Sequence, residues 1–338
     1  MTIATITNAP VPYAWGQPGG VARVLGWAPT ASVQAEYWLG AHPARPSRVL
    51  GGPWGDLGAW QSERGEALPF LLKVLTAASP LSLQAHPTTD QARAGFAREE
   101  RAGIPLSDPS RTFKDPHAKP ELIVALEDGF EALCGFRPVG ETLAFVDAVA
   151  SVVPSPALQA WRARLAGADG VRTAFRWLLS GDAEVADVVA TLSLAAAVEP
   201  ARFALVGRLV TQYPGDPGVA AAQMLNHRTL RAGEALWLPA GNIHAYLSGT
   251  ALELMGPSDN VVRGGLTAKH VDAEQLGLVV DFGAGEPPHL VPVPLGENVV
   301  SYRPRTLASG ARVEFELLRV TGDASLRTRS ASVALCLA

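Results

Sequence analysis

The spacing of apolar and polar residues changes twice along the chain. Up to about residue 136, short alternating runs such as LSLQAH (81–86) and ELIVAL (121–126) predict β-strands, and stretches rich in Pro and Gly predict turns between them. One helix is expected within this region. The segment QARAGFAREERAG (91–103) can be capped by Thr88, Thr89 or Asp90, and Gly103 ends it.

Between about residues 138 and 214 the apolar residues recur with the period of a helix. Ser155-Pro156 is a start signal inside this region, and strand-like alternation returns after YPGDPG (213–218). The helical sets are Leu143/Val146/Val149, Leu158/Trp161/Leu165, Phe175/Leu178/Leu179 and Phe203/Val206/Leu209/Val210. The pattern therefore predicts a mainly β fold that carries a helical insert.

We expect three parts along the chain. Residues 1–136 and 217–298 form one β domain, and residues 137–216 form the helical insert between its two halves. Residues 299–338 form a partial C-terminal β domain, because VEFELLRV and SVALCLA alternate like antiparallel strands. The last run reaches Ala338 without a turn, so we expect this domain to be truncated.

Composition narrows the class of protein. The 338 residues are 48% hydrophobic and 18% charged with a net charge of −4, as in ordinary globular proteins. No basic cluster of the kind that neutralises many phosphates is present, which argues against a nucleic-acid partner. The two widely spaced cysteines, the lack of a signal peptide and the lack of a membrane-length apolar run predict a cytoplasmic protein without a membrane partner.

Lysine is scarce in this chain. Four lysines stand against twenty-four arginines. In a chain that prefers arginine so strongly, a remaining lysine can have a role that requires an amine able to lose its proton, since arginine stays charged. Codon preference with a few leftover lysines is the plain alternative.

The stretch PLSLQAHPTTD (80–90) contains the first candidate metal ligands. On a strand, Ser82, Gln84 and His86 point to one face and the leucines to the other. Histidine is a common ligand of transition metals, whereas an amide oxygen is an unusual one. A solvated strand face with a chance histidine is the alternative.

The stretch KDPHAKPELIVAL (114–126) places an amine beside a carboxylate. Lys119 and Glu121 share one strand face. Because Pro120 favours an edge strand, a surface ion pair is the alternative.

Two further stretches carry candidate chemistry. The spacing G-x5-P-x-G-x2-H from Gly233 to His244 resembles a motif of cupins, small jelly-roll barrels in which a glycine turn brings a histidine to a metal; Ser248 stands where the pattern often has Asn. The stretch LELMGPSDNVVRGGLTAKHVD (252–272) holds Glu253, Asp259, Arg263 and Lys269. A solvent-facing loop with mixed charges is the alternative for the second stretch.

Together the four stretches resemble type I mannose-6-phosphate isomerases, which are zinc-dependent cupin enzymes. YAWG (13–16), AEYWLGAHP (35–43), LPFLLKVL (68–75), GFRP (135–138) and YPGDPG extend the resemblance to about residue 280. The resemblance implies cupin-type jelly-roll barrels plus an α-helical domain, with the catalytic site in residues 1–136 and 217–298. It also implies a Zn²⁺ site, with Gln84, His86, Glu121 and His244 as ligands. Such a set leaves a residual charge of about +1, which suits a Lewis acid with an open coordination position.

The activity implied is interconversion of mannose 6-phosphate and fructose 6-phosphate through a cis-enediol. Glu253 and Lys119 are the acid–base candidates, and the sequence does not rank them. Lys119 would act as a base only if the neighbouring zinc favoured its neutral form. Arg263 fits an electrostatic clamp on the developing oxyanion. The resemblance places Ser82, Lys269 and Lys73 among the substrate- and phosphate-binding residues.

Some features depart from the family or leave alternatives open. Some bacterial relatives carry His directly before Lys-Pro-Glu, where this chain has Ala118 and the histidine one place earlier, His117. A non-catalytic zinc cupin that senses sugar phosphates is the alternative function. An iron-dependent cupin dioxygenase is a third, which the glutamine ligand disfavours. The expected partner is a small sugar phosphate, and the expected assembly is a monomer.

Overall fold

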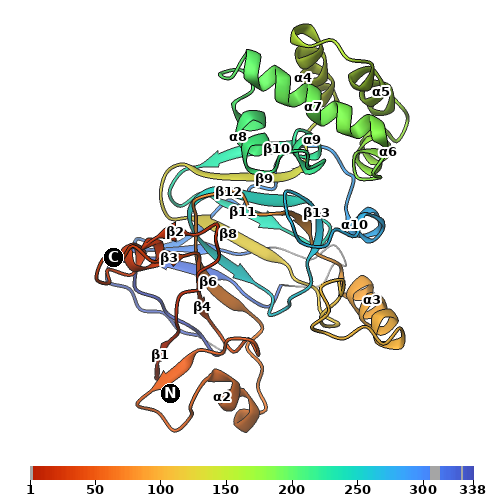
Figure 1. The fold of residues 1–338 in the computed structure, drawn as a ribbon. Helices are drawn as coiled ribbons and strands as arrows, with labels where there is room; N and C mark the ends of the chain where they lie inside the picture. The colour runs from red at the N-terminus through yellow and green to blue at the C-terminus, as the bar shows by residue number, and fades with distance from the viewer. Residues whose placement is uncertain (1–2, 305–312, 329) are drawn as a thin grey trace.

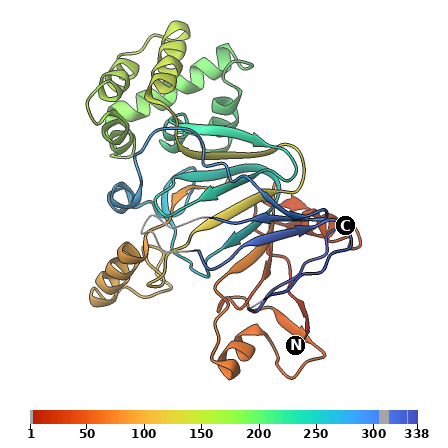
Figure 2. The same ribbon diagram turned by 180° about the vertical axis from the view of Figure 1, so that it is seen from behind.

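The computed structural model describes residues 3–304, 313–328 and 330–338. Figures 1 and 2 show a central β-sheet with a group of helices at one end and smaller sheets beside it. Within the described residues, helices contain more residues than strands do, and the strands form no closed barrel. The fold is therefore mixed helix and sheet, and the mainly β description is not confirmed.

The central sheet has nine strands and is built around β12 (His244–Met255). Strands β9 and β7 pair with β12 near its start, whereas β6 and β8 pair with its second half, from Gly249 to Met255. Because β12 has different partners along its length, it joins two wings of the sheet. The remaining strands extend the wings: β10 pairs with β9, β4 with β6, β11 with β8 and β13 with β7. The bounds are β4 (Glu36–Leu39), β6 (Leu71–Ala77), β7 (Leu83–Ala85), β8 (Glu121–Ala125), β9 (Phe130–Phe136), β10 (Leu225–Leu230), β11 (Ala235–Leu238) and β13 (Val262–Gly265).

A glycine lies where β12 changes partners. Gly249 has φ +109°, and a Cβ placed there would lie 2.7 Å from the Cα of Phe130. Only glycine adopts this backbone conformation without strain. The residue therefore allows β12 to pass close to β9 while it leaves one wing for the other.

Five consecutive helices, the green group at the top of Figure 1, lie against one wing of the sheet. Their buried side chains, among them Trp161 and Phe175, form one core with Leu83 and Leu133 of the sheet. The helices are α4 (Val139–Val152), α5 (Pro156–Leu165), α6 (Gly170–Leu178), α7 (Ala183–Val198) and α8 (Ala204–Gln212), followed by α9 (Gly218–Ala222). The helix predicted after Ser155-Pro156 is confirmed.

Further elements surround the sheet. Helix α3 (Thr89–Arg101) begins with a capping box between Thr88 and Gln91, which confirms the predicted helix and selects Thr88 as its cap. The other helices are α1 (Gly20–Val24), α2 (Leu57–Arg64) and α10 (Ala273–Val279). Two-stranded sheets pair β1 (Thr5–Thr7) with β5 (Arg48–Leu50) and β2 (Gln17–Pro18) with β3 (Val33–Gln34), and a three-stranded sheet joins β14 (Val293–Gly296), β15 (Val299–Tyr302) and β16 (Leu317–Val320).

The strand predicted at SVALCLA (332–338) is wrong. This segment contains no strand, although β16 lies within the predicted VEFELLRV. Val333 and Leu335 pack partly buried against the core that includes Tyr302 and Phe315. The alternation thus reflects side chains that pack on a neighbouring core without strand pairing. Among the described residues, no helix is long and apolar enough to cross a membrane.

Candidate active site

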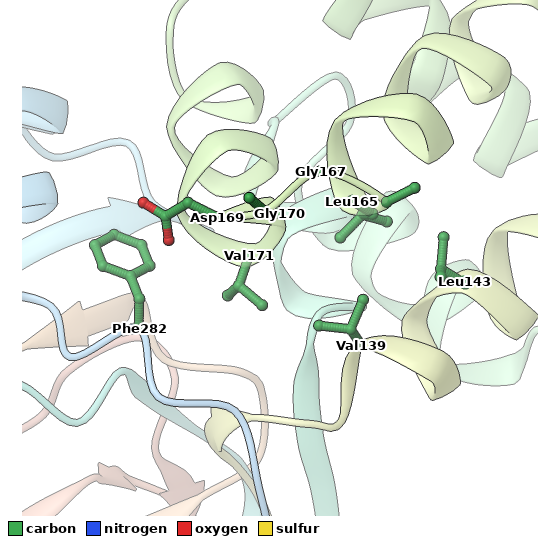
Figure 3. A pocket seen from close by; sticks show the side chains of 10 residues that line it. Val139, Leu143, Leu165, Gly167, Asp169, Gly170, Val171 and Phe282 are labelled. Carbon is green, nitrogen blue, oxygen red and sulfur yellow. The ribbon is translucent and has the colours of Figure 1, made fainter.

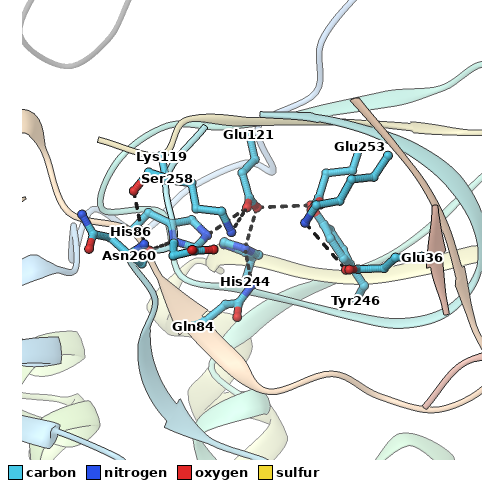
Figure 4. Close-up of polar contacts among 12 residues, drawn as sticks. Glu36, Gln84, His86, Lys119, Glu121, His244, Tyr246, Glu253, Ser258 and Asn260 are labelled. Atoms are coloured by element: carbon cyan, nitrogen blue, oxygen red, sulfur yellow. Dashed lines mark hydrogen bonds and ion pairs between the residues drawn. The ribbon is translucent and has the colours of Figure 1, made fainter. Parts of the chain in front are cut away.

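Three strands bring together two imidazoles and a carboxylate. His86 directly follows β7, Glu121 begins β8 and His244 begins β12. One ligand atom of each lies within 4.8 Å of the others, and all three residues are buried. The Nε2 atoms of His86 and His244 each lie 3.2 Å from a Glu121 carboxylate oxygen, as Figure 4 shows.

Backbone carbonyls orient both imidazoles. The Nδ1 of His86 donates to the carbonyl of Asn260 at 2.7 Å, and the Nδ1 of His244 donates to the carbonyl of Asn242 at 3.0 Å. With Nδ1 as the donor, the Nε2 of each imidazole faces the cluster, and in the neutral form it presents a lone pair there, as metal-binding histidines do. The Nε2 of His86 is buried and has no hydrogen-bond partner among the described residues. A cation would satisfy it.

The protonation of these groups suits a cation. Burial lowers the pKa of His86 to about 4, against the attraction of Glu121. Burial opposes ionisation of Glu121, yet the Lys119 ammonium and the imidazoles hold its pKa well below its usual value. A neutral imidazole and an ionised carboxylate are the forms that bind metals. These residues therefore fit a zinc ion.

Gln84 lies at the rim of the cluster. It is directly opposite His244 in the pairing of β7 with β12. Its Nε2 lies 3.4 Å from Nε2 of His244, and its Oε1 accepts from the Ser82 hydroxyl at 3.5 Å. A half-turn of the amide exchanges the two positions and directs the oxygen at the cluster, as metal binding requires.

Both plain alternatives for the first two stretches are wrong. His86 is only 1% exposed, so it is not a chance histidine on a solvated face, although Ser82 and Gln84 before it are half-buried. Strand β8 lies between β11 and β12, so Lys119 and Glu121 do not form a surface ion pair on an edge strand. Their 2.7 Å contact is buried, which places an amine directly beside the cluster.

A second buried ionic cluster adjoins the first. The Lys73 ammonium lies 3.1 Å from Glu253 and 3.7 Å from Glu36, and it lies over the ring of Trp38 at 4.9 Å. Burial raises the pKa of Glu253, against the attraction of Lys73. Figure 4 shows Glu36, Glu253 and Tyr246 side by side. The Tyr246 hydroxyl is 3.5 Å from Glu121 and links the two clusters.

Three residues of this region were missed by sequence reasoning. Glu36, Tyr246 and His42 carry no spacing signal that separates them from ordinary strand and loop residues. The buried His42 pairs with the half-exposed Asp259 at 3.3 Å. The loop around Asp259 is not wholly solvent-facing, because its neighbours Ser258 and Asn260 are buried.

Arg263 and Lys269 form a separate group of cations. Arg263 lies on β13 opposite Gln84. Partial burial, and then repulsion by the Arg263 charge, lower the pKa of Lys269. Within residues 3–304, 313–328 and 330–338, neither forms an ion pair with a carboxylate. Two neighbouring cations of this kind suit an anionic ligand.

A hollow of about 470 Å³ lies elsewhere, among the helices. Figure 3 shows Val139, Leu143, Leu165, Val171 and Phe282 around it, with Asp169 the charged residue at its edge. None of the clustered histidines, lysines or glutamates lines it. The chemistry therefore concentrates at the ends of β7, β8 and β12.

The fold and the site define a metal-dependent enzyme. Structural zinc sites are usually closed by four ligands, often cysteines, whereas this cluster adjoins a titratable amine and a carboxyl with a raised pKa. The family model "Phosphomannose isomerase type I, catalytic domain" matches residues 3–139.

Similar proteins cover most of the chain. The Escherichia coli mannose-6-phosphate isomerase is 36% identical over an alignment of 313 residues, and the match covers 87% of this chain and 78% of that protein. The human mannose-6-phosphate isomerase is 34% identical and covers 78% of this chain and 69% of its own length. A crystal structure of the Salmonella typhimurium enzyme bound to fructose 6-phosphate and zinc has a TM-score of 0.77 and 34% identity, and covers 88% of this chain and 80% of its own. A zinc-bound holo structure of a mannose 6-phosphate isomerase also has a TM-score of 0.77, at 34% identity, and covers 89% of this chain and 80% of its own.

The chain belongs to the type I mannose-6-phosphate isomerase family. The resemblance drawn from the motifs is confirmed, as is the prediction of an isomerase. The alternatives of a sensor without turnover and of an iron dioxygenase lose their support.

Proposed function

We propose that the buried cluster is the catalytic site at which this isomerase interconverts mannose 6-phosphate and fructose 6-phosphate, with Zn²⁺ as its cofactor. His86, Glu121 and His244 hold the metal, and Gln84 completes the set with its amide oxygen. The observation that carries this proposal is the convergence of the three ligand atoms within 4.8 Å. The buried lone pair of His86, which has no partner among the described residues, supports it. When bound, zinc stabilises negative charge on the sugar oxygens as a Lewis acid.

The reaction requires that a proton move between C1 and C2 of an open-chain sugar. Glu253 and Lys119 are the groups proposed to carry it. Burial raises the pKa of Glu253, so its carboxyl exchanges protons closer to neutral pH than an exposed one does. Lys119 lies against Glu121 and points into the same site. The two groups stay open alternatives for the base.

Lys73 fits the acid–base cluster better than a phosphate site. Two carboxylates already neutralise its charge, and they raise its pKa despite burial. Its contact with Glu253 steadies the ionised form of that carboxyl between proton transfers. Phosphate binding by Lys73 stays a prediction. Its ion pairs with Glu253 and Glu36 favour a role in positioning the Glu253 carboxylate.

The phosphate group is assigned to Lys269 and Ser82. The neighbouring Arg263 lies beside Gln84, where its charge can stabilise an oxyanion of the sugar. Lys269 is more exposed and lies close to Arg263. Ser82 directly precedes β7, the strand that holds Gln84, and its hydroxyl reaches the Gln84 amide at 3.5 Å. A substrate could thus span the distance between a dianion site and the metal cluster.

We also propose the finer features of the fold. The Gly233–His244 motif leads into β12, which supports a cupin-type jelly-roll unit in the central sheet. The consecutive helices α4 to α8 support a helical insert at 137–216 between the two halves of a catalytic domain. The monomeric assembly, the cytoplasmic location and the separate domain at 299–338 stay predictions.

Exchange of the C2 hydrogen of mannose 6-phosphate tests the activity. In heavy water the enzyme should replace this hydrogen with deuterium and form fructose 6-phosphate, because the base that takes the C2 proton exchanges with solvent. Proton NMR follows both changes in one sample. If the zinc-loaded protein binds the sugar phosphate without exchange or conversion, the isomerase assignment is wrong.

A further inference from the structure

Asn260 lies where the loop after β12 returns toward β13. Its side chain is fully buried, with 0% exposure. Its backbone carbonyl accepts the 2.7 Å hydrogen bond from Nδ1 of His86. One contact of Asn260 thus sets the orientation of a proposed zinc ligand.

The side-chain amide of Asn260 holds a second segment. Its Oδ1 accepts from the backbone N–H groups of Lys114 at 2.7 Å and Asp115 at 3.3 Å. Its Nδ2 donates to the carbonyls of Asp115 and His117, both at 2.8 Å. The amide therefore uses all of its ordinary capacity as acceptor and donor on residues 114–117.

This second segment leads directly into the site. Lys119 and Glu121 follow His117 by two and four residues. The loop is also held from its other side, because Asp115 accepts from the Ser258 hydroxyl at 2.9 Å and from the Asp259 N–H at 2.9 Å. Figure 4 shows Asn260 and Ser258 beside His86 and Lys119.

Asn242 provides a natural comparison. Its carbonyl accepts from Nδ1 of His244 at 3.0 Å, as the Asn260 carbonyl does for His86. Its side-chain Oδ1 is buried with no hydrogen-bond partner among the described residues. The backbone role of the two asparagines is the same, and only the side chain of Asn260 joins two segments of the site.

We propose that Asn260 is a positioning residue of the metal centre, which sets His86 through its backbone and Lys119–Glu121 through its side chain. The inference rests on the proposed zinc site. His86 and Glu121 belong to segments that both pair with β12. Asn260 is bonded to both segments as well, so it adds a second constraint on the spacing of these ligands. Groups that orient metal ligands typically change metal affinity by roughly 10- to 100-fold when they are removed.

Zinc affinity of the metal-free protein measures this role without reference to activity. The Asn260→Ala variant keeps the carbonyl but loses the amide, and its zinc dissociation constant should rise by about 10-fold or more. A chromophoric chelator in competition reports the constant. The matched control, Asn242→Ala, should bind zinc within about threefold of the wild type.

Stability of the metal-free protein separates positioning from a general structural role. If Asn260→Ala lowers the melting temperature but its folded form binds zinc as tightly as the Asn242→Ala control, the inference is wrong. Should Asn260→Ala not fold, Asn260→Asp keeps the shape and the acceptor but loses both donors. It should still weaken zinc binding severalfold, and unchanged affinity would overturn the inference.

The wild-type titration distinguishes this inference from the proposed function. A wild type that binds no zinc contradicts both. A wild type that binds one zinc per chain, with Asn260 variants of equal affinity, contradicts the positioning role alone.

Discussion

Lys73 and Glu253 stand directly opposite each other on β6 and β12. Their ion pair could not be predicted from spacing, because 180 residues separate them in the chain. The polar row Gln84–His86 and the pair Lys119–Glu121 were predictable, since alternation within one strand sets which side chains share a face. Contacts within a strand are thus accessible to sequence reasoning, whereas contacts across strands depend on the register that folding creates.

Replacement of Glu253 by glutamine tests the acid–base cluster. Gln keeps the shape but cannot carry a proton, so kcat should fall by roughly 10²–10⁴-fold while zinc content stays at the wild-type level. Steady-state rates with mannose 6-phosphate and metal analysis give both numbers. The control Glu286→Gln changes a side chain that is 88% exposed and should leave kcat unchanged. A Glu253→Gln enzyme with normal kcat would leave Lys119 as the remaining candidate.

Replacement of Lys269 by alanine tests the phosphate site. Loss of one partner of a partly buried charge pair costs about 2–5 kcal/mol, so kcat/KM for mannose 6-phosphate should fall by roughly 30-fold or more. Free mannose lacks the dianion and should lose little. The deciding quantity is the ratio of kcat/KM for phosphorylated over free sugar. An unchanged ratio means that Lys269 does not bind phosphate.

Among the secondary-structure elements, strand β12 brings together two parts of the candidate site. It begins at a proposed metal ligand, His244, and carries the acid–base candidate Glu253 in its second half. The sequence predicted that strand-like alternation returns after YPGDPG (213–218), but not that one of these strands changes partners at Gly249. An alternating pattern of apolar residues predicts a strand but does not determine which strands will pair with it. The wrong prediction at SVALCLA (332–338) has the same cause. Apolar side chains of this segment pack on a neighbouring core, but its backbone forms no strand.

Gly249→Ala tests the junction in β12. Its φ of +109° and the 2.7 Å approach to Phe130 leave no room for a Cβ, so the free energy of unfolding should fall by about 2 kcal/mol or more. Chemical denaturation measures the change. Gly140→Ala is the matched control, because nothing lies within 4 Å of its Cβ position and it sits in α4, where alanine is favoured. Equal stability of the two variants would contradict the junction's need for glycine.

The contact between α8 and the sheet carries a pH dependence. Glu131 of β9 forms an ion pair with Arg208 of α8, and its carboxylate lies 3.0 Å from Nε2 of His227 of β10. Hydrogen bonds from His227 and then Arg208 lower the pKa of Glu131 to about 2. Because the pKa of Glu131 is lower in the folded protein than in the unfolded chain, its carboxylate stabilises the fold at pH values above the unfolded-state pKa. This stabilisation is lost as the pH falls toward about 2. The side chains are partly exposed, so the gain should be about 0.5 kcal/mol.

The comparison that reveals this contribution is Glu131→Gln against wild type. The variant should be less stable at pH 7 and low salt, and the difference should shrink as the pH falls below about 4.5 or as salt rises. Urea unfolding across this range measures it. A difference that does not vary with pH would show that Glu131 acts through packing instead of charge.

At the scale of the molecule, the helices and the sheet share one continuous core. Residues of α4 to α8 pack with Leu83 and Ala85 of β7, the strand that carries Gln84 and leads into His86. Helices in this part of the chain were predictable from the period of its apolar residues. The packing of these helices against β7, which carries the proposed zinc ligand Gln84, was not predictable. The pattern shows that a helix has an apolar face but not which element covers it. The helices thus support the strand on which half of the proposed zinc ligands depend.

The dependence of turnover on zinc tests whether the buried His86–Glu121–His244 cluster is the catalytic metal site. Metal-free protein receives increasing zinc, and the initial rate of fructose 6-phosphate formation from mannose 6-phosphate is measured at each step. We expect almost no rate without metal and a linear rise that saturates at about one zinc per chain, because His86, Glu121 and His244 form a single candidate site. The His244→Ala variant should not be restored at the same zinc concentrations. Full activity in verified metal-free protein would contradict the account.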